Sequence, residues 1–281
     1  MRYFEARVAK NESLSGGYFR LSLAGCHPLR ESRPGQFVML RGDWERDPLL
    51  PRAFSLLSVG SDGEAAILAK TVGRGTALLE RAAAGARISV LGPLGTAFPA
   101  PSSQFIDLLV GGGVGIPPIY MQAAVAAGAG LAPRSEILYG GRRTSDLVLL
   151  DEMKAFGVGL HLATEDGTTG RHGRITAELE ARLAVHAGKA PVRIMACGPN
   201  AMLWAVGRIA RERDIPCFIS VEEQMACGIG VCLGCAVPAR SRPFRYVCKD
   251  GPVFDAADIL DVAGDDPTQK PASTPPAGCL T

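Results

Sequence analysis

A short run of cysteines near the C-terminus constrains this chain more than any other feature. Three of them follow one another with the spacing C-x4-C-x2-C, and a lone fourth comes later: Cys227, Cys232, Cys235 and Cys248. This is the spacing of plant-type [2Fe–2S] ligation, in which thiolates hold two irons in one tight loop. Gly228, Gly230 and Gly234 lie between them; glycine permits positive φ and lets backbone N–H groups approach the sulfides. The sequence therefore predicts a [2Fe–2S] cluster on these four cysteines.

Two other interpretations of the cysteines stay open. A structural zinc site usually takes two close pairs of ligands, whereas here the first spacing is four and no second close pair exists. Four buried free thiols are also possible, because free cysteine is a common core residue. The spacing favours the cluster over both.

Composition excludes several classes of protein. The 281 residues leave room for two or three domains, and 47% hydrophobic with 21% charged residues is ordinary for a globular protein. A net charge of +2 gives no reason to expect nucleic acid or an anionic membrane as partner. The four remaining cysteines are scattered, unlike a secreted disulfide framework, and no apolar run approaches membrane-spanning length. We expect a soluble, cytoplasmic protein.

Residues 1–100 have the pattern of short strands separated by glycine and proline, with one helix expected at 75–81. Such a pattern predicts a small antiparallel β-barrel. The candidate strands are 3–8, 18–23, 36–40, 52–58, 64–71 and 87–91.

Residues 101–215 change to apolar runs that alternate with helical segments, which predicts a doubly wound α/β domain with a parallel sheet. The expected strands are 105–110, 136–139, 159–163 and 192–196, and the expected helices are 117–127, 146–155, 175–184 and 200–212. Residues 216–262 form a small cluster domain. The proline-rich tail at 263–281 cannot bury enough apolar surface and is expected to be disordered.

Two features of the α/β domain indicate a nucleotide site. A glycine loop between its first strand and helix would let a pyrophosphate approach the backbone, through Gly111, Gly112, Gly113 and Gly115. The strict G-x-G-x-x-G pattern fails, and the next strand ends in Arg142 and Arg143 rather than in an acidic residue, so this is no standard Rossmann dehydrogenase. The second feature follows strand 192–196, at the edge where open sheets bind ligands: Cys197, Gly198 and Pro199. A structural turn and a buried thiol are the alternatives.

The barrel carries weaker signs of a flavin site. In Arg52-Ala53-Phe54-Ser55 the arginine offers a fork for a pyrophosphate, and the serine hydroxyl suits a ring nitrogen. Gly75 and Thr76 open a helical segment, where N–H groups favour a phosphate. The alternatives are a surface arginine beside a core phenylalanine and an N-cap threonine. Glu222 and Glu223 are general acid/base candidates, or else a helix start or a solvated pair.

Taken together, the motifs resemble the ferredoxin-reductase superfamily. The block 222–235, with Val247-Cys-Lys-Asp-Gly-Pro-Val-Phe254 and Glu165-Asp-Gly-Thr-Thr-Gly-Arg-His-Gly173, is similar to the electron-transfer subunit of class 1B dihydroorotate dehydrogenase, over residues 1–262. The family often has proline or a larger residue at the position of Ala53, and the tail after Gly264 is an extension.

The resemblance implies FAD on the barrel, held by Arg52, Ala53, Phe54, Ser55, Leu68, Ala69, Lys70, Gly75 and Thr76. It implies NAD at the glycine loop and at Cys197-Gly198-Pro199, the [2Fe–2S] cluster on the four cysteines, and an FMN-containing dihydroorotate-oxidising partner in a heterotetramer. Electrons would pass from dihydroorotate through FMN, cluster and FAD to NAD+, in pyrimidine synthesis. No catalytic residue is expected beyond Ser55 and Cys197, the side chains nearest the reacting rings.

Two other functions remain open from the sequence. The chain could be an NAD(P)H reductase component for an oxygenase or a bifurcating complex, or a metal-stabilised binding module with vestigial nucleotide sites. NAD and NADP are also not distinguished, because Arg142 and Arg143 could meet a 2′-phosphate or be solvated.

Overall fold

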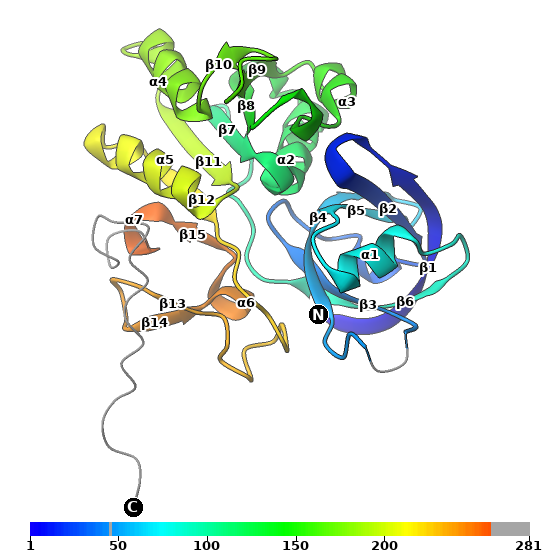
Figure 1. The fold of residues 1–281 in the computed structure, drawn as a ribbon. Coiled ribbons are helices and arrows are strands. Elements are labelled where there is room, and N and C mark those ends of the chain that lie inside the picture. The colour runs from blue at the N-terminus through cyan, green and yellow to red at the C-terminus, as the bar shows by residue number, and fades with distance from the viewer. Residues whose placement is uncertain (45–46, 260–281) are drawn as a thin grey trace, which may run out of the picture.

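The computed structural model describes residues 1–44 and 47–259, which form a barrel, a layered α/β region and a small C-terminal region (Figure 1). The C-terminal region lies beside both the barrel and the α/β region. The tail at 263–281 falls outside the described residues. Within those described, no helix is long and apolar enough to cross a bilayer.

The first 100 residues form the antiparallel barrel that the punctuated pattern predicts. Its strands pair in the order β1-β2-β5-β4-β3-β6, and β6 pairs back with β1, so the sheet closes without an edge. Helix α1 (Arg74–Glu80) lies where a helix is expected. The strands are β1 (Arg2–Ser13), β2 (Tyr18–Ala24), β3 (Phe37–Gly42), β4 (Arg52–Val59), β5 (Ala65–Lys70) and β6 (Arg87–Leu94).

Strand alternation gives the barrel an apolar inside and two buried outer faces. Side chains such as Phe19 and Ile67 fill the interior. Their neighbours Tyr18 and Leu68 point outward and pack against the α/β region. On the other side Met39, with the rest of the outward face of β3 and β6, joins the core shared with the C-terminal region. The barrel is therefore held on two sides.

The α/β region has the doubly wound architecture expected. Its sheet runs β10-β9-β8-β7-β11-β12-β15, with α2 and α3 packed on one face and α4 and α5 on the other. The elements are β7 (Ile106–Gly112), α2 (Ile116–Gly128), β8 (Ser135–Gly141), α3 (Leu150–Ala155), β9 (Gly159–Thr164), β10 (Arg171–His172), α4 (Ile175–His186), β11 (Val192–Cys197), α5 (Asn200–Glu212), β12 (Cys217–Ser220) and β15 (Val253–Asp255).

Helix α3 starts later than predicted. The sequence suggested a helix from residue 146, whereas the structure has a 3-10 turn at Thr144–Asp146 and begins α3 at Leu150. Leu149 has a φ of 64°, a left-handed conformation that an α-helix does not pass through. Asp146 is thereby freed from the helix and faces the barrel.

The sheet also continues past residue 215, where the α/β domain was expected to end. Strand β12 pairs in parallel with β11, and β15 pairs antiparallel with β12, so the sheet is mixed at this edge. These strands have four and three residues, too few for a periodic pattern to reveal. Their place depends on pairing with segments far away in the chain.

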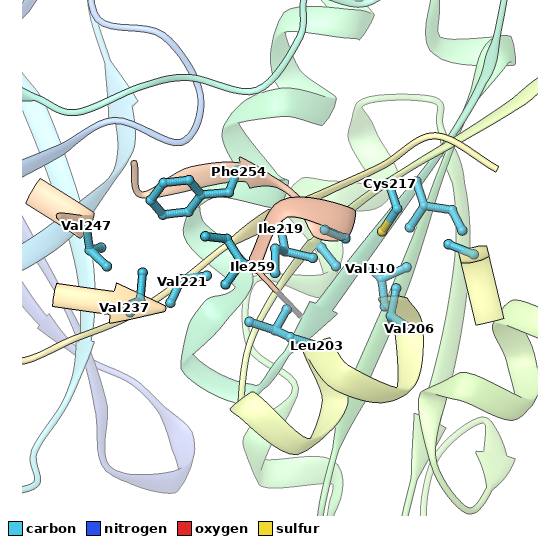
Figure 2. Close-up of a cluster of buried hydrophobic side chains, with 14 of the residues drawn as sticks. Val110, Leu203, Val206, Cys217, Ile219, Val221, Val237, Val247, Phe254 and Ile259 are labelled. Atoms are coloured by element: carbon cyan, nitrogen blue, oxygen red, sulfur yellow. The ribbon is translucent and has the colours of Figure 1, made fainter. Parts of the chain in front are cut away.

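The C-terminal region shares its core with the sheet. It contains a small hairpin of β13 (Ala236–Pro238) and β14 (Phe244–Tyr246), followed by α6 (Val247–Asp250) and α7 (Ala256–Ile259). Figure 2 shows Val237 and Val247 facing Val221 and Phe254, and Leu203 of α5 beside Ile259. The cysteine loop between β12 and β13 is thus anchored at both ends in one hydrophobic core.

Thr96, just after the barrel, ties the barrel to the C-terminal region. Its hydroxyl accepts from the N–H of Val253 at 3.1 Å and donates to the carbonyl of the same residue at 2.9 Å. Its own N–H donates to the carbonyl of Gly251 at 2.6 Å. A Cβ on Gly95 would lie 2.5 Å from the Pro252 ring, so the approach is close enough to require glycine there.

We expect Thr96→Val to lower the free energy of unfolding by about 1–3 kcal/mol, because it leaves a buried N–H and carbonyl without their partner. Thr96→Ser keeps the hydroxyl and is the matched control, with a smaller loss. Urea denaturation of both variants measures the difference; equal stabilities would show that the hydroxyl does not hold this contact.

Candidate functional site

The four cysteines converge on one loop at the surface of the C-terminal region. Cys235 and Cys248 are buried, Cys227 is partly buried and Cys232 is exposed. Backbone N–H groups point at the sulfur atoms: that of Gly230 lies 3.1 Å from Cys248 Sγ, and that of Cys232 lies 3.4 Å from Cys227 Sγ. Gly228 and Gly230 both have positive φ, as a loop wrapped around a small inorganic core requires.

The four thiols influence one another: Cys227 interacts with Cys232, and Cys248 interacts with both Cys235 and Cys227. Burial opposes ionisation of Cys227, but N–H donors from Cys232 and Ile229 outweigh it and lower the pKa of this thiol to about 6. Burial and the neighbouring Cys235 raise the pKa of Cys248 to about 12. In the described part of the chain no three Cys, His, Asp or Glu side chains are placed to hold a single metal ion.

The cysteine loop packs directly on the barrel. A Cβ on Gly228 would lie 2.6 Å from Cγ of Met39 and 3.3 Å from Cδ1 of Leu94. Met39 on β3 pairs across the strands with Ala53 on β4. The cysteine loop is therefore one strand away from the segment expected to hold a flavin.

The residues expected around a flavin lie on both sides of the barrel wall. Phe54 packs into the interior, whereas Ala53 is exposed and Ser55 is partly exposed on the outer surface. Arg52 reaches the start of α1, where a Cβ on Gly75 would lie 3.1 Å from its Nε. Arg52 and the start of α1, which are far apart in the sequence, thus lie next to each other at the barrel surface.

Several of the other flavin candidates are occupied elsewhere. The Thr76 hydroxyl caps α1, accepting from the N–H of Gly73 at 3.1 Å. Leu68 and Ala69 are buried, the former against the α/β region and the latter inside the barrel. Lys70 leaves the barrel surface and forms an ion pair of 2.9 Å with Asp146. Of the strand segment 68–70, Lys70 alone presents its side chain to the cavity described below.

The two expected nucleotide loops meet at the carboxyl edge of the sheet. Gly111 on β7 pairs with Cys197 on β11. A Cβ on Gly115 would lie 2.6 Å from the Cys197 carbonyl oxygen and from the Gly198 nitrogen. Gly115 therefore permits contact between the two loops, which is the structural role that the sequence analysis gave as the alternative for this glycine turn. Gly112, Gly113 and Pro199 instead face open space.

That open space is a cavity of about 710 Å³ between the barrel and the sheet edge. Its barrel side is formed by Tyr18 and Lys70, and its other walls by the ends of β7, β8 and β11 and the start of α4. Partial burial opposes ionisation of Asp146, but the ammonium group of Lys70 outweighs it and lowers the pKa of this carboxyl. Burial and the charge of Asp146 raise the pKa of Tyr18 to about 12, so its hydroxyl stays neutral.

Cys197 and Glu222 do not line this cavity. The Cys197 thiol is fully buried, and burial followed by the charge of Glu222 raises its pKa far above the ordinary value. Its side chain does not line the cavity. Glu222 keeps contact with solvent, yet the protein surrounding it raises the pKa of its carboxyl. Glu222 and Glu223 follow β12 in irregular chain, so they do not start a helix.

Comparisons with known proteins agree with this arrangement. Residues 109–208 match the oxidoreductase NAD-binding domain family, and residues 222–260 match the iron-sulfur cluster binding domain of dihydroorotate dehydrogenase B. The dihydroorotate dehydrogenase B (NAD(+)), electron transfer subunit of Geobacillus kaustophilus (strain HTA426) is 36% identical over 258 residues, covering 90% of this chain and 96% of the relative. The chain belongs to this family.

Membership makes the chain an oxidoreductase subunit of the NAD-dependent dihydroorotate dehydrogenase B system of pyrimidine biosynthesis, with an implied catalytic partner subunit. A subunit of the same name from Clostridium acetobutylicum is 30% identical and covers 92% of this chain and 98% of that relative. The fold is the ferredoxin-reductase-like fold that binds FAD and NAD, joined to an iron–sulfur region.

Two solved structures have folds similar to that of this chain. A structure described as a flavin-based electron-bifurcating NADH-dependent reduced ferredoxin-NADP oxidoreductase has a TM-score of 0.77 at 27% identity, covering 90% of this chain and 89% of that one. A ferredoxin NADP+ reductase from Neisseria gonorrhoeae with bound FAD and NADP has a TM-score of 0.64 at 18% identity, with 75% and 92% covered. The latter likeness concerns the fold alone.

The cavity residues that the sequence analysis did not single out include Tyr18, Asp146 and Arg174. Tyr18 begins a barrel strand and Asp146 ends a 3-10 turn, and neither stands in a motif. Arg174 directly follows the segment 165–173 that resembles the family, which was the one available signal.

Gly115→Ala tests the loop contact. We expect it to destabilise the protein by roughly 1–3 kcal/mol and to weaken binding of ADP-ribose, because the added methyl group would meet backbone atoms that cannot move cheaply. Gly128→Ala, at the other end of α2, meets nothing within 4 Å and should be neutral or slightly stabilising. Thermal unfolding and calorimetric titration of both variants check this. Unchanged ADP-ribose binding in Gly115→Ala would mean that the loop contact does not shape the cavity.

Proposed function

We propose that this subunit carries electrons from an FMN-containing, dihydroorotate-oxidising partner to NAD+, by way of a [2Fe–2S] cluster and FAD. One observation carries the proposal: the cysteine loop at Gly228 packs on Met39, whose cross-strand neighbour is Ala53 in the expected flavin segment. An iron–sulfur centre and a flavin bound at these two places would be separated by a single barrel strand, β3. A flavin suits the middle position because it exchanges electrons singly with iron–sulfur centres and in pairs with nicotinamide.

The spacing of the thiols supports two irons rather than one zinc ion. The pattern C-x4-C-x2-C followed by a lone fourth cysteine, at Cys227, Cys232, Cys235 and Cys248, is that of plant-type two-iron ligation. A zinc site needs four ligands around a single point. The N–H groups of Gly230 and Cys232 would add hydrogen bonds to the sulfurs, which tune such a centre.

We assign the remaining roles to residues at the barrel surface and in the cavity; of these, Arg52 also donates through Nη1 to the Leu50 carbonyl at 2.7 Å. On the barrel, residues 1–100, Arg52 and the start of α1 would bind the flavin phosphates, while Ser55 would hydrogen-bond the flavin ring from the outer wall. In the α/β domain, which we extend from 101–215 to include β12 and β15, Gly112, Gly113 and Pro199 would contact the nicotinamide nucleotide. Cys197 would act through its backbone, since its thiol is buried.

The exposed apolar side chains of the cysteine loop support a partner at this surface. Ile229, Val231 and Leu233 are 41%, 74% and 51% exposed, and they surround the exposed Cys232. Apolar groups gathered around a redox centre are typical of a surface covered by another protein. We therefore infer that the FMN-containing partner docks on this loop, in a heterotetramer.

A second function shares the same carriers but has another partner. The similarity to the electron-bifurcating oxidoreductase, over 90% of this chain, favours a flavin and iron–sulfur subunit of such a complex. The two functions differ in the protein that docks on the cysteine loop. The binding partner therefore decides between them.

Reconstitution with the candidate dihydroorotate-oxidising subunit tests the proposal. We expect the co-purified pair to reduce NAD+ with dihydroorotate, and the separate subunits not to do so. NADH formation is followed by the absorbance of the reduced nicotinamide ring. Failure of the pair to associate, or association without NAD+ reduction, would favour the bifurcating function or another redox partner.

Cys232→Ser tests the order of carriers. We expect the variant to lose cluster absorption and electron transfer from the partner while NADH still reduces bound FAD, because the cluster lies between the flavin and the partner. Cys26→Ala, a cysteine buried inside the barrel, is the control and should keep both activities. If NADH no longer reduced FAD in Cys232→Ser but still did so in Cys26→Ala, the proposed order of carriers would be contradicted.

A further inference from the structure

Met39 of the barrel touches the cysteine loop next to one of the expected cluster ligands. Gly228 directly follows Cys227 and is buried, and a Cβ there would lie 2.6 Å from Cγ and 3.1 Å from Sδ of Met39. Met39 is itself only 1% exposed, because Leu91 and Leu94 of β6 belong to the same packed core. In such close packing the methionine side chain cannot swing out into solvent when the loop presses on it.

The other two glycines between the cysteines lack this contact with the barrel. Gly230 also has a positive φ, of 82°, but a Cβ there would meet the flexible side chain of the exposed Lys249, at 3.1 Å. A Cβ on Gly234 would lie 3.7 Å from Cys232 Sγ, an ordinary contact distance. Gly230 therefore requires glycine for its backbone conformation, whereas Gly228, with a φ of 70°, has a second requirement, which is its approach to Met39.

Met39 lies on the same outer face of the barrel as the expected flavin segment. Residues directly opposite each other on antiparallel strands share a face; Met39 lies opposite Ala53, and Phe37 lies opposite Ser55. Met39 and Phe37 are buried in the core shared with the C-terminal region, whereas Ala53 is exposed and Ser55 is partly exposed. The β3 part of this face is thus covered by the C-terminal region, and the β4 part reaches solvent.

We propose that Met39 is a positioning residue for electron transfer between the two redox sites. Its side chain sets how closely the cysteine loop, and the cluster on that loop, approaches a flavin bound at β4. Methionine suits this place because its unbranched, polarizable side chain fills irregular gaps. Electron transfer weakens steeply as the gap between two carriers widens, so a displaced loop would slow the transfer without altering either carrier. The inference rests on the carriers of the proposed function and adds the residue that fixes their separation.

Met39→Phe tests the inference in the FAD- and cluster-loaded chain, mixed with NADH in the absence of oxygen. NADH gives a hydride, two electrons with one proton, to FAD, and FAD then passes one electron to the cluster. Flavin bleaching reports the first step, and loss of the visible absorption of the cluster reports the second. We expect the larger side chain to displace the loop, so that the second step slows several-fold. The first step, the iron content and the midpoint potential of the cluster should stay unchanged.

Two further variants separate positioning from general damage to the barrel. Met39→Leu conserves the side-chain volume and should keep the rate of the second step. Leu21→Phe adds a ring to the barrel interior, away from the cysteine loop, and should keep that rate as well. An unchanged second step in Met39→Phe would overturn the inference. Equal slowing in Leu21→Phe, or a change in cluster potential that accounts for the slowing, would overturn it too.

Gly228→Ala alters the same contact from the side of the loop. We expect it to slow the second step, and we expect the double variant Gly228→Ala/Met39→Ala to regain part of the rate. Shortening the methionine removes the atoms that the new methyl group would meet. Both variants carry the same backbone strain at residue 228, so a recovery reports the relieved contact. If Gly228→Ala does not retain the cluster, iron content replaces the rate in this comparison. No recovery in the double variant would overturn the inference.

The unaltered chain separates this inference from the proposed function. If it held no iron, or if NADH failed to reduce its flavin, the proposed carriers would be wrong and the inference would fall with them. If both steps ran in the unaltered chain and Met39→Phe matched it, the carriers would stand and only the positioning role of Met39 would be wrong.

Discussion

The close contact between the end of the barrel and the C-terminal region is the constraint on which the rest of the structure depends. Thr96 hydrogen-bonds the backbone of Gly251 and Val253, and Gly95 leaves no room for a side chain against Pro252. These contacts are short and mostly made by backbone atoms, so the two parts cannot separate without leaving buried polar groups unpaired. They hold the cysteine loop against Met39. The electron-transfer role needs that proximity, because it depends on carriers being near each other.

The second outer face of the barrel forms one wall of the cavity. Apolar packing of Tyr18 and Leu68 against the α/β region is supplemented by ion pairs that cross the boundary, Lys70 with Asp146 and Arg20 with Glu152. The cavity is left where the barrel wall and the carboxyl edge of the sheet do not touch. Its walls therefore belong to both parts, and a ligand in it contacts the barrel that we propose holds the flavin. The barrel thus lies between the cavity and the cysteine loop.

Local patterns predicted what depends on consecutive residues. The alternation of apolar strands and helices is confirmed by the fold, the cysteine spacing agrees with the family match over 222–260, and the role of the glycine loop after β7 stays a prediction. Leu149 shows the limit of such patterns: its left-handed φ delays α3, although the residues around it suit a helix. Strands β12 and β15 were missed because short strands exist only through the partners that they pair with.

The sequence by itself predicted the kinds of carrier, because thiol spacing, glycine placement and strand periodicity are set by covalent distance along the chain. It also indicated the family over residues 1–262, which the comparisons confirm. Only the tertiary structure decided how these parts relate: that Gly228 meets Met39, that the Cys197 thiol is buried, and that Arg174 joins Arg142 at one cavity. Such contacts join residues far apart in the chain and depend on complementary surfaces, which no local pattern of residues records.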